Sequence, residues 1–272
     1  MIPRIIHLTW FSGDEYPESI KKCLETWKKV LPDFKVKIWT MEMARSLNIL
    51  WVNEALDAKK WAFAGDVVRA YAVWTEGGVY MDTDIWMLKR FDEFMYLPMV
   101  FFMEINRKEW EMDNPEGIVN AEGLCLIPEQ YVKGRQIQAA FFMGEKGNPI
   151  LKDIIDFYRT LKFIRDDGSF NFTISPCIYA KLLEQYGFLY KDEEQHLEND
   201  ITVFPSSFVA LSRYERSKNA IAIHLGAHEW EPRGPWLKFK YIIHNSRFYS
   251  LLKLLGIERF RRLYWSKSSK CK

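Results

Sequence analysis

Segments typical of buried strands alternate with segments typical of helices along most of this 272-residue chain. The opening is strand-like over 2–11, helical over 17–31 and strand-like again over 34–39, which is a β-α-β unit. The same patterns predict helices over 61–76, 149–163 and 175–186, and strands over 79–81, 98–105, 137–143, 201–204 and 220–224. Such alternation favours an α/β fold with a mostly parallel mixed sheet.

Composition favours one large domain with an appendage. A chain with 48% hydrophobic and 16% aromatic residues can bury a sizeable core. The net charge is only +2, but residues 237–272 carry ten Lys or Arg against the single acid Glu258, so basic character is local. We therefore expect a Rossmann-like domain over 1–236 and a helical, basic segment over 237–272.

Targeting and cysteine patterns give few signals. We see no secretory signal in the first residues and no apolar run near the roughly 18 residues that span a bilayer, so we expect a cytoplasmic protein, soluble or peripheral. The four cysteines are scattered, without the short spacing of a zinc site or a disulfide framework. Buried or idle thiols are expected.

Asp82 and Asp84 follow directly on the buried strand 79–81. Two carboxylates at this spacing can turn toward one hard cation, and Mg²⁺ or Mn²⁺ with two or three protein ligands leaves positions for water and phosphate. Ligands of open α/β sheets gather outside the carboxyl ends of the strands, where this pair would lie. Taken alone, Asp-x-Asp is more often an ordinary solvated turn, so its context decides.

That context is a helix over 61–76 containing Ala62-Phe63-Ala64-Gly65-Asp66-Val67-Val68-Arg69, followed by Gly77-Gly78-Val79-Tyr80-Met81-Asp82-Thr83-Asp84. The run resembles, in the same order, the signature of the family 32 glycosyltransferases that carry an Asp-x-Asp motif. The segments 2–11 and 138–149 resemble the same family. The resemblance covers most of 2–231, weakly over 89–136, and implies a GT-A type fold and a retaining sugar transfer.

Asp66 and Arg69 lie three residues apart on the helix, off its apolar stripe, so their side chains are neighbours on one face. An ordinary surface ion pair is the plain alternative. The resemblance implies instead that both bind the donor sugar, Asp66 through its hydroxyls and Arg69 through sugar or phosphate oxygens. By the same resemblance, which extends to clostridial glucosylating toxins, Trp10 stacks on the nucleotide base, whereas the plain alternative is a core tryptophan. We assign no role to His7.

The turn after strand 220–224 departs from the family pattern, but its His and final Trp still resemble related enzymes. We interpret His224 as the third metal ligand and Trp230 as a diphosphate contact, with His228 and Glu229 as rivals for the metal. A plain strand-end histidine is equally consistent with the residues alone.

No carboxylate nucleophile can be picked out from the sequence. Gln138, where relatives often have Asn, is predicted to line the reacting face and to steady an oxocarbenium-like state. A same-face substitution assisted by the leaving phosphate needs no nucleophile, and the resemblance favours it.

Residues 237–272 interleave apolar and basic side chains, as interfacial helices do. Docking on an anionic membrane surface is one interpretation, and packing on the domain is the other. Nucleic-acid binding is not expected, because the segment has no recognition motif and the body is acidic.

The leading hypothesis is a metal-dependent hexosyltransferase that uses a nucleotide-sugar, with UDP favoured and Mn²⁺ or Mg²⁺ as cofactor. Its acceptor would be a growing surface glycan, such as a capsular or lipid-linked glycan, at the inner face of the plasma membrane. The rivals are a metal-dependent phosphohydrolase or nucleotidyltransferase, and a non-catalytic carbohydrate- or membrane-binding module.

Overall fold

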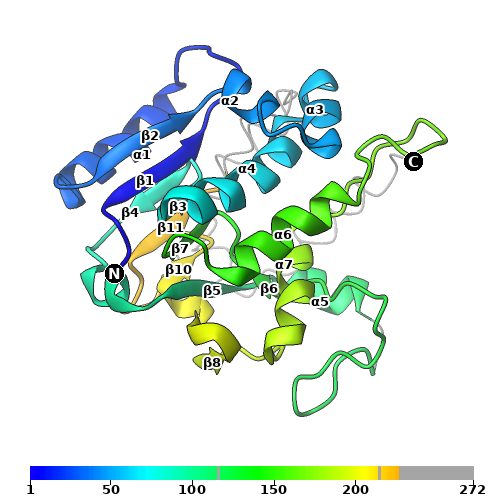
Figure 1. Ribbon diagram of the computed structural model, residues 1–272. Helices are drawn as coiled ribbons and strands as arrows, with labels where there is room; N and C mark the ends of the chain where they lie inside the picture. Colours follow the sequence, from blue (N-terminus) through cyan, green and yellow to red (C-terminus); the bar gives the residue numbers. More distant parts are fainter. Residues whose placement is uncertain (115–116, 214–215, 227–272) are drawn as a thin grey trace, which may run out of the picture.

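The computed structural model describes residues 1–114, 117–213 and 216–226, and shows a mixed α/β fold (Figure 1). The predicted segment 237–272, with its membrane-docking interpretation, lies outside the described residues. Within them, no helix is both long enough and apolar enough to cross a membrane.

The predicted β-α-β opening is confirmed. Strand β1 (Ile5–Thr9) pairs in parallel with β2 (Lys35–Trp39), and α1 (Glu18–Val30) connects them. Two helices that the sequence pattern did not predict follow, α2 (Met41–Arg45) and α3 (Leu50–Asp57). The predicted long helix is α4 (Trp61–Glu76), which leads to β3 (Gly78–Met81) beside β1.

Two glycines allow the chain to turn from α4 into β3. Gly77 and Gly78 have φ of 67° and 114°, in the region that favours glycine. A Cβ at Gly78 would lie 2.6 Å from the carbonyl oxygen of Ile5, so the close approach of β3 to β1 also requires a residue without a side chain.

The main sheet has the order β2-β1-β3-β7-β5-β9-β8, and β6 pairs with β5 at the side. Its remaining strands are β5 (Met99–Ile105), β6 (Arg135–Ile137), β7 (Phe141–Gly144), β8 (Gln195–Leu197) and β9 (Ile201–Phe204). Strand β7 is antiparallel to both β3 and β5, while β5 and β9 are parallel. The expected α/β class with a mostly parallel mixed sheet is confirmed.

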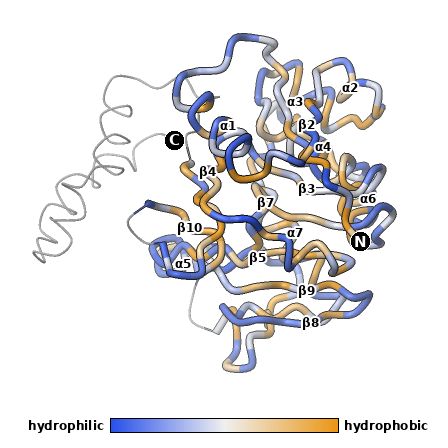
Figure 2. The backbone as a smooth tube through the Cα atoms, turned by 90° about the vertical axis from the view of Figure 1, so that its left-hand side faces the viewer, coloured by the Kyte–Doolittle hydropathy of each residue, from blue (hydrophilic) through white to orange (hydrophobic). Residues whose placement is uncertain are grey.

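Hydrophobic side chains on both faces of this sheet build the core, because alternate residues of a strand point to opposite sides. Tyr80, Phe101 and Phe142 face a cluster shared with α3, α4, α6 (Pro149–Arg159) and α7 (Ser175–Leu183). Val79 and Phe141 face a second cluster with α1. Figure 2 shows hydrophobic residues along middle strands such as β5 and hydrophilic residues on outer loops.

A second, three-stranded sheet has the order β10-β11-β4 and consists of β4 (Ile85–Met87), β10 (Val209–Ala210) and β11 (Ala222–His224). Strand β11 runs antiparallel to β4, and His224 is the register partner of Ile85. This pairing brings the end of β11 next to Asp84, across a long stretch of sequence.

The remaining elements are short: α5 (Arg107–Asp113) and the 3-10 turns η1 (Asp92–Tyr96), η2 (Glu184–Tyr186), η3 (Glu198–Asp200) and η4 (Ser206–Phe208). The expected strand over 137–143 is wrong as a single element, because β6 ends at Ile137 and β7 begins at Phe141. Between them, the backbone N–H of Gln138 still donates to Phe102 O at 2.8 Å, so the chain changes course beside β5.

Candidate active site

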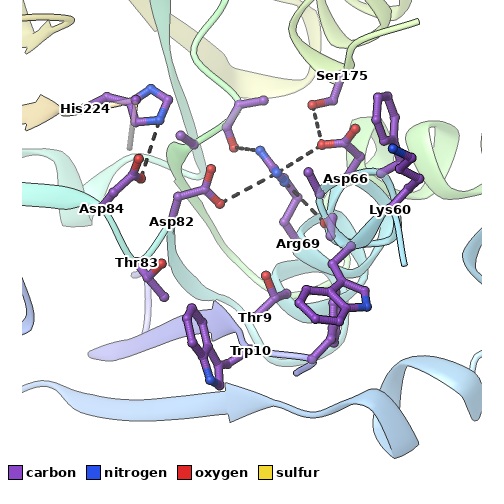
Figure 3. A pocket seen from close by; sticks show the side chains of 18 of the residues that line it. Thr9, Trp10, Lys60, Asp66, Arg69, Asp82, Thr83, Asp84, Ser175 and His224 are labelled. Carbon is purple, nitrogen blue, oxygen red and sulfur yellow. Dashed lines mark hydrogen bonds and ion pairs between the residues drawn. The ribbon is translucent and has the colours of Figure 1, made fainter. Parts of the chain in front are cut away.

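A cavity of about 910 Å³ opens at the edge of the sheet where β1 and β3 end. It is bordered by the loop after β1, the first half of α4, the turn at Asp82–Asp84, the ends of β5 and β11, the Gln138–Ala140 segment and the start of α7. Figure 3 shows side chains from these separate elements pointing into one space. The predicted position, at the carboxyl end of β3, is confirmed.

The Asp82–Asp84 segment forms a tight turn with fixed backbone contacts. The backbone N–H of Asp82 donates to Ala140 O at 2.9 Å, and that of Ile85 donates back to Asp82 O at 3.0 Å. Asp84 is only 9% exposed. The solvated turn that the tripeptide alone would suggest is therefore not what forms, since the two carboxylates are held at the wall of the cavity.

His224 completes a three-residue cluster with the two aspartates. Its Nε2 lies 3.5 Å from Asp84 Oδ1, and the backbone N–H of Leu225 donates to Asp84 O at 3.2 Å. One ligand atom from each of Asp82, Asp84 and His224 lies within 4.8 Å of the other two. The structure thus brings together the three residues predicted as metal ligands.

The donor set of this cluster fits a divalent cation. Two carboxylates supply the oxygen ligands that Mg²⁺ and Mn²⁺ prefer, and an imidazole is an accepted nitrogen ligand of transition metals. Three protein ligands leave coordination positions for water and for oxygens of a substrate. The cluster also concentrates negative charge, which a cation would neutralise.

Asp66 and Arg69 form a buried ion pair on the other side of Asp82. Each is 6% exposed, and Arg69 Nη2 lies 3.0 Å from Asp66 Oδ1 and 3.6 Å from Asp82 Oδ1. Arg69 Nη1 donates to Ala139 O at 2.8 Å. The two residues do share one face of α4, but they face the cavity rather than solvent, so the surface-pair interpretation is wrong. Arg69 links the Asp66 carboxylate to the Asp-x-Asp turn (Figure 3).

Ser175, which the sequence pattern did not single out, is a further partner of Asp66. Its hydroxyl donates to Asp66 Oδ1 at 2.7 Å from the first residue of α7. Burial raises the pKa of Asp66 to about 6, and Arg69 and Ser175 offset only part of this rise. The carboxylate is therefore close to a change of charge near neutral pH.

Tyr80 is a second residue that the sequence did not single out. Its hydroxyl donates to Asp82 Oδ1 at 2.6 Å, and the Arg69 guanidinium lies 5.0 Å from the centroid of its ring. Burial raises the pKa of Tyr80 well above its usual range, so the phenol stays protonated as a donor. Strand alternation supplies a signal for it, since residues 80 and 82 share one face of the chain.

Trp10 lies at the rim of the cavity, directly after β1. Its indole Nε1 donates to Asp14 O at 2.7 Å, and its ring centroid lies 4.6 Å from that of Tyr16. The side chain is partly exposed rather than a core residue. His7, in contrast, is fully buried: Trp39 Nε1 donates to its Nδ1 at 3.2 Å, and its Nε2 lies 2.8 Å from Gly77 O, so it is a neutral core histidine.

Gln138 lines the floor of the cavity between β6 and β7 and is 1% exposed. Its Oε1 accepts from the backbone N–H of Ala140 at 3.1 Å. The predicted Trp230, with its rivals His228 and Glu229 for the metal, lies outside the described residues.

The fold and the site together define an α/β protein whose cavity combines a cluster of residues that could hold a divalent cation with a buried Asp–Arg pair. Residues 17–100 match the model of the family described as "Glycosyltransferase sugar-binding region containing DXD motif". These residues contain Asp66, Arg69, Asp82 and Asp84, so the resemblance read from the motifs is confirmed. Over residues 17–100 the chain is therefore similar to the sugar-binding region of glycosyltransferases with the DXD motif.

Curated relatives match over about a third of the chain. Inositol phosphoceramide mannosyltransferase 2 of Schizosaccharomyces pombe is 33% identical over 103 residues, which cover 36% of this chain and 30% of that protein. Mannosyl phosphorylinositol ceramide synthase SUR1 of Saccharomyces cerevisiae is 30% identical over 105 residues, 36% of this chain and 26% of that protein. The aligned part thus spans less than a third of the length of these relatives.

Among solved structures, a glycosyltransferase involved in the glycosylation of the major capsid of PBCV-1 aligns with a TM-score of 0.42 and 13% identity. The alignment covers 82% of this chain and 94% of that chain.

Proposed function

We propose that this protein transfers a hexose from a nucleotide-sugar, with a UDP-sugar favoured, to a growing surface glycan with retention of configuration. The observation that carries the proposal is the cluster of Asp82, Asp84 and His224 in the same cavity as the Asp66–Arg69 pair. Asp82 belongs to the cation cluster and also contacts Arg69 of the buried pair, so the two groups are adjacent. This arrangement suits a donor that has a diphosphate at one end and a sugar at the other.

Asp82, Asp84 and His224 would hold Mn²⁺ or Mg²⁺. The bound cation would neutralise the negative charge of the leaving nucleoside diphosphate. The residues around the cluster keep it in place: Tyr80 holds Asp82 through its hydroxyl, and β11 holds His224 against β4.

Asp66 and Arg69 would bind the donor sugar. The Asp66 carboxylate is oriented by Ser175 and Arg69, and it is positioned to accept hydrogen bonds from sugar hydroxyls. Arg69 contributes a planar cation between Asp66 and Asp82, from which it would contact sugar or phosphate oxygens. Both side chains are already fixed by backbone and side-chain contacts, which lowers the cost of ordering them on binding.

Trp10 would stack on the nucleotide base at the rim, and Trp230 would contact the diphosphate. Gln138 would steady the oxocarbenium-like state on the reacting face, and the leaving phosphate would assist substitution on the same face. Residues 237–272 would dock on an anionic membrane surface, which would place the protein in the cytoplasm at the inner face of the plasma membrane, near a lipid-linked glycan acceptor.

The family match supports glycosyl transfer over the two rival functions. A phosphohydrolase or nucleotidyltransferase would need the cation cluster but not a sugar-binding pair. A non-catalytic binding module would need no cluster of cation ligands beside that pair.

The proposal is tested by incubating the full chain with Mn²⁺ and a panel of UDP-, GDP- and CMP-sugars without acceptor, and measuring slow release of the sugar. One preferred donor is expected, and D84A should lose its hydrolysis. The matched control D156N alters an exposed carboxylate of α6 and should keep the wild-type rate. Phosphate release that does not depend on the sugar, or the absence of any donor hydrolysis or binding, would contradict the proposal.

A further inference from the structure

Glu104, a carboxylate that none of the assigned roles uses, also lines the cavity. It lies near the end of β5, where its register partner across the antiparallel pair is Gln136 of β6. Gln136 Nε2 donates to Glu104 Oε1 at 2.9 Å. The same cavity contains Asp82, His224 and Gln138, so Glu104 belongs to the floor on which a bound donor sugar would rest.

A chain of hydrogen bonds fixes the position of this carboxylate. A carboxylate accepts hydrogen bonds only, so the amide nitrogen of Gln136 must face Glu104, and its oxygen must face away. That oxygen accepts from the Cys177 thiol at 3.0 Å, and Gln136 is 2% exposed. Cys177 lies on α7, the helix whose first residue, Ser175, holds Asp66. One helix therefore orients carboxylates at two places in the cavity.

Gln138, next to Glu104, has a side-chain donor with no hydrogen bond of good geometry, although its amide is close enough to Glu104 to lower the pKa of that carboxyl. Among the described residues its Nε2 makes no hydrogen bond, although the side chain is 1% exposed and lines the cavity. A buried donor that is left unsatisfied is costly, and native structures rarely keep one without a reason. The donor is therefore available to a bound ligand with an acceptor oxygen, such as a sugar.

Glu104 is distinct from the cation cluster. Among the described residues, the group with ligand atoms close enough to share one ion is Asp82, Asp84 and His224. Burial raises the pKa of Glu104, and nearby His224 and the amides of Gln136 and Gln138 offset part of this rise. A carboxylate that is held in a poorly solvated site strongly stabilises positive charge that develops beside it during the reaction.

We infer that Glu104 faces the anomeric carbon of the donor sugar and stabilises the positive charge that develops there, while Gln138 Nε2 binds a sugar oxygen. Glu104 is then a catalytic residue that acts electrostatically, and Gln136 is its positioning residue. This inference rests on the proposed glycosyl transfer. Glu104 would be the anionic group on the reacting face that could not be picked out from the sequence, and its role requires no covalent step.

The test compares wild type with E104Q, which keeps the shape of the side chain and removes its charge. The expected result is a fall of about 100-fold in kcat for donor hydrolysis and for transfer. Affinity for nucleoside diphosphate with Mn²⁺ should stay within about twofold, because Glu104 is not part of the Asp82, Asp84 and His224 cluster. Q136L, which removes the donor that positions Glu104 together with the acceptor of the Cys177 thiol, should lower kcat by about tenfold with KM unchanged. D156N again serves as the control.

Each outcome decides the inference. Wild-type turnover matched by E104Q would overturn it, with the proposed function intact. Loss of nucleotide and Mn²⁺ binding in E104Q would also overturn it, because Glu104 would then belong to the cation site. A wild type that hydrolyses no donor would refute the proposed function and this inference together. Should E104Q fail to fold, E104D decides: it keeps the charge but shortens its reach, and a wild-type kcat would count against the inference.

Discussion

The stability of the protein should depend on pH through Asp66, and the substitution D66N isolates this dependence. The carboxylate is 6% exposed, and its pKa rises from an ordinary 3.8 to about 6 in the folded protein. The folded state therefore binds a proton more tightly than the unfolded state. Asp66 contributes stability below about pH 4, and this contribution is lost as the pH rises through about 6.

The magnitude follows from the two pKa values. A difference from 3.8 to about 6 corresponds to about 3 kcal/mol, at about 1.4 kcal/mol for each pH unit. An asparagine at this position does not titrate, so D66N should lack this slope. The difference in unfolding free energy between D66N and wild type should therefore move in favour of D66N by about 2.5 kcal/mol between pH 4 and pH 7, since the unfolded carboxyl is already partly ionised at pH 4.

The assay is urea unfolding of both proteins at several pH values between 4 and 7, without metal or nucleotide. The quantity to follow is the difference between the two unfolding free energies, since other titrating groups contribute equally to both. A difference that stays constant across this range would refute the account of Asp66 as a buried carboxylate with a raised pKa.

Two further substitutions test the supports of the site. Y80F removes the hydroxyl that holds Asp82 at 2.6 Å, and Mn²⁺ affinity, measured by calorimetry, should fall by about tenfold; an unchanged affinity would show that Tyr80 does not orient the ligand. G78A should lower the free energy of unfolding by about 2 kcal/mol, because its Cβ would lie 2.6 Å from Ile5 O. Gly147 also has a positive φ, but the space around it is open, so G147A serves as the control without a clash. Thermal unfolding of both variants measures the cost of the clash at residue 78. Equal losses of stability in G78A and G147A would contradict this explanation.

Much of the fold and of the cation site could be predicted from the sequence because their signals are local. Strand-like and helical patterns are short-range, and they placed β1, α1, β2, α4 and β3 in order. The Gly77–Gly78 stop and the strand after it placed Asp82 and Asp84 at the edge of the sheet. His224 was predicted as the end of a strand, and the pairing of β11 with β4 brings it to Asp84.

The features that sequence reasoning missed depend on contacts between distant segments. Ser175 reaches Asp66 from a helix more than a hundred residues away along the chain. Glu104 becomes a site residue only because β5 and β6 pair beside the cavity. Helical periodicity placed Asp66 and Arg69 on a common face but could not show that α7 and the sheet cover this face, so their burial was not predicted.

The most direct test of the central claim is Mn²⁺ binding to the full chain in the presence of a nucleoside diphosphate, followed by electron paramagnetic resonance. If Asp82, Asp84 and His224 form one cation site, wild type should bind Mn²⁺ together with the nucleotide. D84N and H224A should each weaken Mn²⁺ binding by at least about tenfold, and D156N should not. Equal Mn²⁺ affinity in wild type, D84N and H224A would contradict the account.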